Sequence, residues 1–168
     1  MIMFAMGDVI RNWFDDFFKK SLDDISRPWD MDHLLAVGIT KNLKKGGDHL
    51  TAVKQWQQTI GNIRPWPLEL NRHDLSLPPS AKLQPFDDND NTGYQDALKT
   101  YGLQANDHVL EVSLCSREWL NIDGETVEYK NQNDSKFIID CFIERMMVIY
   151  TKWYEELRIN RLFPDYSE

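Results

Sequence analysis

Cysteine is scarce in this chain, and the two cysteines, Cys115 and Cys141, stand far apart in the sequence. Small secreted scaffolds carry a dense set of cysteines, whereas redox and zinc-ribbon sites need a CxxC pair. The sequence has neither pattern. We therefore expect a protein of a reducing compartment, and we predict a cytoplasmic location.

Long hydrophobic runs are also lacking. The most continuous apolar stretch, 137–150, is interrupted by Asp140, Glu144 and Arg145, whereas a helix that crosses a bilayer needs about 20 predominantly apolar residues. The opening MIMFAM has no basic residues before it and is too short for the core of a signal peptide. The sequence predicts no membrane association.

The chain contains none of the common local signatures of catalysis, because GxSxG, the P-loop and GxGxxG are all missing. The four histidines never recur at i and i+4 on one predicted helix, so no zinc-binding pair is formed. We accordingly predict a protein that is not an enzyme, with no catalytic residues, no metal and no cofactor.

Basic residues are scarce in one segment, and this is the most informative imbalance. Residues 84–128 carry ten acidic residues against Lys99 and Arg117, which accounts for the net charge of −8. Nucleic-acid binding needs clustered lysine and arginine, so direct contact with nucleic acid is not expected. A surface of one sign favours a partner of the opposite sign. The charge therefore predicts a basic protein partner.

What is present is enough for a folded core, since the 168 residues are 42% hydrophobic and include six tryptophans. Helical spacing is clear near both ends of the chain, while Pro-rich and Gly-rich stretches separate the middle elements. We predict a single domain, 1–168, divided into a helical layer (8–61), an irregular crossover (62–91), a short helix (92–102), a β-meander (108–130) and a long helix (135–160).

The predicted meander depends on an alternation of apolar residues at Leu110, Val112 and Leu114, followed by Asp123-Gly124 as a hairpin turn. In this hairpin Trp119 would lie on the polar face, beside acidic residues. The fold class predicted is α+β: N-terminal helices and a long C-terminal helix packed on a small antiparallel β-meander of about three strands.

Two metal-dependent interpretations were weighed against turn and strand chemistry. Asp88, Asp90 and Asp96 match positions of a calcium-binding loop, but Lys99 takes the place of the bidentate glutamate that calcium requires. Glu128 and Lys130 have the spacing of a nuclease ExK, yet no second acid lies opposite Glu128 in the predicted hairpin to share an ion. Neither interpretation is favoured.

The leading hypothesis is an acidic inhibitor that occupies a basic site on a toxin or a nucleic-acid-binding enzyme, as immunity proteins, antitoxin-like proteins, anti-defence inhibitors and DNA mimics do. An exposed aromatic beside acids is typical of an interface hot spot. The residues predicted to bind the partner are Asp87, Asp88, Asp90, Asp96, Glu111, Glu118, Trp119, Asp123, Glu125 and Glu128.

Two alternatives stay open. One is a small enzyme or ligand-binding domain with a site near the 64–74 crossover, where Arg72, His73 and Asp74 would supply the polar groups. The other is a structural subunit of an assembly that buries exposed aromatic residues against copies of itself. The sequence does not specify the oligomeric state.

Overall fold

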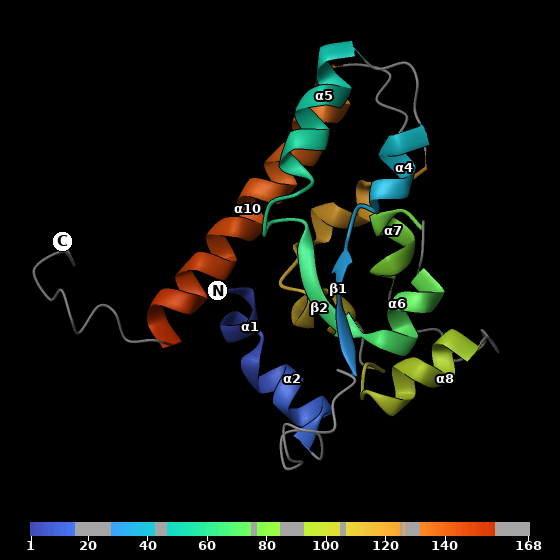
Figure 1. Cartoon of the computed structure of the whole chain (residues 1–168), viewed down its shortest axis with the longest axis vertical. Coiled ribbons are helices and arrows are strands. Elements are labelled where there is room, and N and C mark those ends of the chain that lie inside the picture. Colours follow the sequence, from blue (N-terminus) through green and yellow to red (C-terminus); the bar gives the residue numbers. More distant parts are fainter. Residues whose placement is uncertain are drawn as a thin grey trace, which may run out of the picture.

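A two-stranded antiparallel sheet lies at the centre of the protein (Figure 1). The structure is a computed structural model that describes residues 1–15, 28–42, 47–74, 77–84, 93–104, 107–124, 126 and 132–156. The two strands are β1 (Trp29–His33) and β2 (Ile63–Pro67). Their register places Asp30 opposite Trp66 and Asp32 opposite Arg64.

Helices cover the ribbon on both sides. The long helix α10 runs past one side with α5 and α1 packed against it, and α4, α6, α7 and α8 lie on the other side (Figure 1). The helices are α1 (Ile2–Ala5), α2 (Gly7–Trp13), α4 (Val37–Asn42), α5 (Gly47–Trp56), α6 (Leu68–Asp74), α7 (Pro79–Lys82), α8 (Gly93–Thr100), α9 (His108–Val112), the 3₁₀ helix η1 (Arg117–Asn121) and α10 (Gln132–Glu156).

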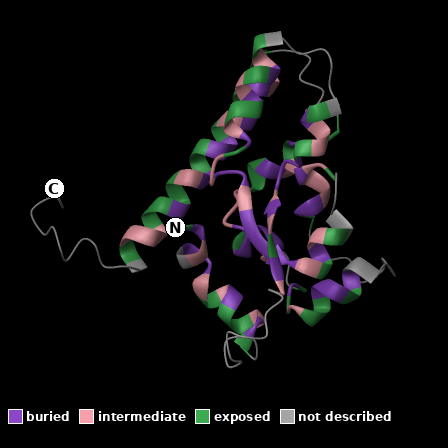
Figure 2. Cartoon of the chain, in the orientation of Figure 1, coloured by how far each residue is buried: buried purple, intermediate pink, exposed green. Residues whose placement is uncertain are grey.

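The core has two apolar clusters, and buried residues concentrate around the ribbon (Figure 2). The larger cluster centres on Trp66, Trp119 and Phe142, and it joins the ribbon to α5, α8, α9 and α10. The smaller one packs α1 and α2 against Trp29 and Ile149. One end of α10 therefore belongs to each cluster, and this helix connects the whole core.

The ribbon has two unusual features along its edges. Pro65 and Pro67 lie two residues apart on β2 and have no amide hydrogen to donate. They therefore fit only positions whose backbone nitrogen makes no hydrogen bond to the neighbouring strand. On β1, the Met31 amide donates to the Asp30 carboxylate at 2.7 Å, and the Lys82 ammonium donates to the His33 carbonyl at 2.7 Å. Side chains thus engage backbone groups of a strand that pairs, among the described residues, only with β2.

The mixed helix-and-strand class predicted from the sequence is confirmed, but within the described ranges the sheet has two strands, and neither lies in the predicted meander. Residues 108–112 form a helix and residues 117–121 form a 3₁₀ helix. The strand prediction failed because Val109, Val112 and Ser113, all buried, also fit a helical period. In η1 the three-residue period buries Trp119 and Ile122 together. The rest of the predicted meander, residues 127–130, lies outside the described residues.

The expectations for the first half of the chain also need correction. Residues 29–33, which fall in the predicted helical layer (8–61), form β1, and the next helix starts only at Val37. The predicted irregular crossover contains β2, α6 and α7. By contrast, α5, α8 and α10 occupy stretches in which helices were predicted.

Gly61 is the point of closest approach between the turn before β2 and α10. A Cβ atom built on Gly61 would lie 2.2 Å from the Phe142 carbonyl oxygen and 3.1 Å from the Met146 Cγ. The first of these contacts is with helix backbone, which cannot rotate away. Only glycine fits at this position without moving α10.

We predict that Gly61→Ala lowers the free energy of unfolding by roughly 1–3 kcal/mol, because the methyl group forces the turn and the helix apart. Urea titration followed by circular dichroism measures the change. Gly7→Ala is the matched control, since nothing lies within 4 Å of a Cβ at that position. Equal stability of the two variants would contradict the close packing.

Candidate functional site

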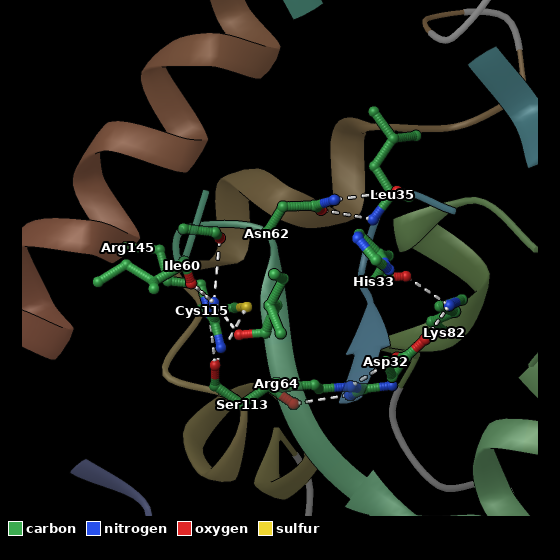
Figure 3. A network of polar contacts seen from close by, with 12 residues as sticks. Asp32, His33, Leu35, Ile60, Asn62, Arg64, Lys82, Ser113, Cys115 and Arg145 are labelled. Atoms are coloured by element: carbon green, nitrogen blue, oxygen red, sulfur yellow. Dashed lines mark hydrogen bonds and ion pairs between the residues drawn. The ribbon is translucent and has the colours of Figure 1, made fainter. Parts of the chain in front are cut away.

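A network of charged side chains is buried beside the ribbon (Figure 3). The Asp32 carboxylate accepts from Arg64 Nε at 2.9 Å and from Lys82 Nζ at 2.6 Å. Arg64 Nη1 also donates to Ser113 Oγ at 2.8 Å, and its guanidinium lies 3.5 Å from the centre of the Trp66 ring. One carboxylate therefore contacts two cations, and Arg64 also contacts a hydroxyl and an aromatic face.

Arg145 brings a third buried cation into this region from the middle of α10 (Figure 3). Its Nη1 donates to the carbonyls of Ile60, Gly61 and Ile63 at 2.9–3.0 Å, and its Nε donates to the Ser113 carbonyl at 2.8 Å. Ser113 caps the C-terminus of α9, where the helix dipole favours a cation. Burial lowers the pKa of Arg145, but an arginine remains charged in a folded protein.

The buried network holds elements in place and does not itself form an exposed site. Asp32 is 3% exposed, and Arg64, Lys82 and Arg145 are no more than 1% exposed. These charged groups are therefore almost fully shielded from solvent. Arg145 instead fixes the end of α9 and the turn before β2 against α10, so it determines the shape of the surface above it.

A pocket of about 390 Å³ lies on that surface, between α9 and α10. Leu114 is central to its shape because this residue has a positive φ of 57°. The Cys115 amide donates to Leu110 and the Leu114 amide to Glu111, which together make the Schellman turn that ends α9. Glycine is usual at this left-handed position, so leucine here costs backbone strain and keeps an apolar side chain at the pocket. The lining residues are Glu111, Leu114, Cys115, Ser116, Glu144, Arg145 and Val148.

Exposed carboxylates surround the pocket. Glu111 of α9 and Glu144 of α10 both line it, and Ser116 Oγ donates to Glu144 at 2.9 Å. Burial, followed by the nearby charges of Glu144 and Glu118, raises the pKa of Cys141 to about 12. None of the three glutamates forms an ion pair within the described residues. Their charges therefore remain available to another molecule.

Of the predicted partner-binding residues, Glu111 lines this pocket, and Glu118 is exposed on η1, where its carboxylate accepts from Asn121 Nδ2 at 3.2 Å. Asp96 is exposed on α8 and lies 3.6 Å from Lys99, while the exposed Asp123 accepts from the Thr126 amide at 2.8 Å. The other predicted acids, Asp87, Asp88, Asp90, Glu125 and Glu128, lie outside the described residues, as does most of the loop weighed as a calcium site.

Trp119 does not occupy the exposed position expected from the hairpin. It is 0% exposed and packs on Phe142, with ring centres 5.7 Å apart. The correction follows from the 3₁₀ helix, which turns Trp119 into the core together with Ile122. The Trp119 side chain therefore does not reach the surface in this structure.

Glu144 was not among the residues predicted to bind the partner. Glu144 lies outside the segment of surplus negative charge, so a count of charge along the chain did not include it. A helical signal was available, because Glu144, Val148, Thr151 and Glu155 recur with the spacing of one helix face. The structure confirms that these four residues line a single shallow depression on α10.

A second pocket, of about 450 Å³, lies on another part of the molecule, along β1. It runs past four consecutive β1 residues, 30–33, and reaches the start of α4 and one side of α6. From α6 it is lined by Leu68, Asn71 and Arg72, and Arg72 is exposed. This pocket adjoins the 64–74 crossover that the sequence offered as an alternative site. The side chains of His73 and Asp74 lie outside the description.

Comparison of the chain with protein-family models, with curated proteins and with solved structures finds no match. Across the described ranges, no helix combines the length and the apolar character needed to cross a bilayer. In the same ranges, no three side chains of His, Cys, Asp or Glu gather as metal ligands would.

We predict that Asp32→Ala lowers the free energy of unfolding by roughly 3–5 kcal/mol, because it removes the buried carboxylate that both Arg64 and Lys82 contact. Urea titration measures the loss. Asp96→Ala serves as the control, since that aspartate is exposed and its contact with Lys99 contributes at most about 1 kcal/mol. A loss in Asp32→Ala no larger than in the control would show that the network is dispensable.

Proposed function

We propose that this chain is a cytosolic, non-enzymatic binding protein that holds a basic segment of a protein partner against the face formed by α9, η1 and α10. The observation that carries the proposal is the group of exposed glutamates, Glu111, Glu118 and Glu144, which have no ion pair in the described part of the chain. We call this group the glutamate face. A lysine- or arginine-rich segment of the partner supplies positive charges that pair with these glutamates.

The surroundings of the glutamate face support a binding function. Lys99 and Arg117, the two basic residues of the acidic segment, contact Asp96 and Asp107 respectively. They therefore contribute little positive charge to the surface. Because Arg145 fixes the end of α9 against α10 beneath the glutamates, the carboxylates are held in place before a partner arrives, which lowers the entropic cost of binding.

The partner class proposed is a basic protein such as a nuclease toxin or a nucleic-acid-binding enzyme. Carboxylates on a rigid scaffold can occupy the positions that phosphates take in such a cleft. An inhibitor of the immunity, antitoxin-like or anti-defence type would act in this way. No catalytic group is required for that action.

We predict that replacing Glu111, Glu118 and Glu144 by glutamine abolishes partner capture, because it removes the charge while keeping the size of each side chain. The measurement is affinity capture from the native host, quantified by mass spectrometry for wild type and variant. A genuine partner is basic and is released by about 0.5 M NaCl, where screening reduces charge–charge attraction.

The matched control carries the same change in net charge elsewhere: Asp8→Asn, Asp48→Asn and Glu69→Gln, all at exposed positions. It should capture the partner as wild type does. Equal loss in both triple variants would attribute capture to overall charge and reject the glutamate face. Capture that is indifferent to salt would reject the electrostatic mechanism.

A second candidate function is supported by the pocket along β1. Its volume of about 450 Å³ lies within the range of small-molecule sites, and Arg72 offers a positive charge at its edge. Because Asp30 also lines the pocket, the ligand class proposed is a small molecule with a carboxylate or phosphate for Arg72 and an amino group for Asp30. This function would make the chain a ligand-binding domain or a small enzyme.

A thermal-shift screen with small carboxylates and phosphates tests this candidate. A ligand in large excess over its dissociation constant, by about 100-fold, stabilises the fold by roughly 2.7 kcal/mol, and Arg72→Ala should remove the shift. Lys54→Ala, which changes an exposed cation on α5, is the control. No shift with any anion, or a shift that survives Arg72→Ala, would reject the pocket as an anion site.

A further inference from the structure

The face of α10 next to the glutamates carries exposed apolar side chains. Ile143, Met147 and Tyr150 recur at i, i+4 and i+7, which places them on one stripe of the helix. Val148 lies beside them and also lines the pocket between α9 and α10. Met147 is the most exposed, at 60%. We call these four residues the apolar stripe.

The stripe and the pocket are continuous. Glu144 and Val148 line both the pocket above Arg145 and the depression along the later turns of α10. The combined surface has apolar side chains along its length. Its charged lining is three carboxylates, Glu111 on the α9 side, Glu144, and Glu155 toward the end of α10, with one lysine, Lys152, beside them and Arg145 beneath. An occupant therefore needs apolar groups along one side and positive charges beside them.

This pattern also argues against a second copy of the chain as the occupant. A two-fold contact would bring the same surface against itself, so that the three carboxylates of each copy, Glu111, Glu144 and Glu155, outnumber Lys152, the one cation of this lining besides the buried Arg145, in the interface. Like charges placed close together across an interface are unfavourable. A partner of opposite charge removes this repulsion.

Resting on the function proposed above, we infer that the segment docked on this surface is a basic amphipathic helix of the partner. Its apolar side lies along the stripe, as in other helix-in-groove complexes. One of its lysine or arginine side chains enters the pocket, with the alkyl stem against Leu114 and Val148 and the charge near Glu111 and Glu144. The positive charge of Arg145 beneath is engaged by four backbone carbonyls.

Two labelled peptides of identical composition test the inference with the full chain. Each has about 18 residues of leucine, alanine and lysine, long enough for marginal helix formation. In one peptide the leucines recur at helical spacing, and in the other they are permuted to remove the apolar side. Fluorescence anisotropy gives the dissociation constants. We expect the amphipathic peptide to bind at least about tenfold more tightly than the permuted peptide.

Met147→Gln should weaken binding of the amphipathic peptide by about tenfold and leave the permuted peptide unaffected, because it changes the apolar contact and not the charge. Leu77→Gln is the matched control, since Leu77 is also an exposed apolar residue but lies away from α10. Both residues are exposed, and unchanged circular dichroism confirms that each variant folds.

The outcomes separate this inference from the proposed function. If both peptides bind equally and the glutamine triple variant loses both, the glutamate face stands and the helix is rejected. If neither peptide binds wild type, both are rejected. If sedimentation shows a dimer that Met147→Gln dissociates, a second copy occupies the stripe and the helical partner is rejected.

Discussion

The guanidinium group of Arg145 is the constraint on which the arrangement of this protein depends. It joins the middle of α10, the turn before β2 and the end of α9 through hydrogen bonds to four carbonyls. Each bond gives a backbone carbonyl a charged donor, and hydrogen bonds to charged groups contribute more than neutral ones. Directional bonds from a planar group also fix position more narrowly than apolar contact does. Arg145 therefore fixes the end of α9 relative to α10, and these two helices carry Glu111 and Glu144.

The sequence allowed the regular helices to be predicted but not the centre of the fold. Amphipathic spacing and clear ends identify α5, α8 and α10. The ribbon was missed because β1 buries a charged residue, Asp32, and because β2 contains two prolines, which normally argue against a strand. The partner of Asp32, Arg64, lies 32 residues further along the chain, and no local pattern reveals such a pair.

The candidate site was predictable only in part. The surplus of acids pointed to Glu111 and Glu118, although the strands expected to carry them are helices. Glu144 enters the site through folding, since α10 places it beside α9. The burial of Arg145 could have been inferred, because it lies three residues after Phe142 and four before Ile149, and both of these are on the buried face of α10. What it binds could not, because carbonyl groups have no signature in a sequence.

The side-chain bonds along β1 have a consequence for how this molecule behaves when crowded. Unpaired strand edges are templates for intermolecular β-sheet growth, and proteins protect them with charged side chains and prolines. Here the Met31 amide donates to the Asp30 carboxylate, and the His33 carbonyl accepts from Lys82. On β2, Pro65 and Pro67 have no amide hydrogen to offer a further strand. These devices make the ribbon a poor seed for fibrils. The molecule can thus expose apolar side chains on α10 and still be abundant without polymerising through its sheet.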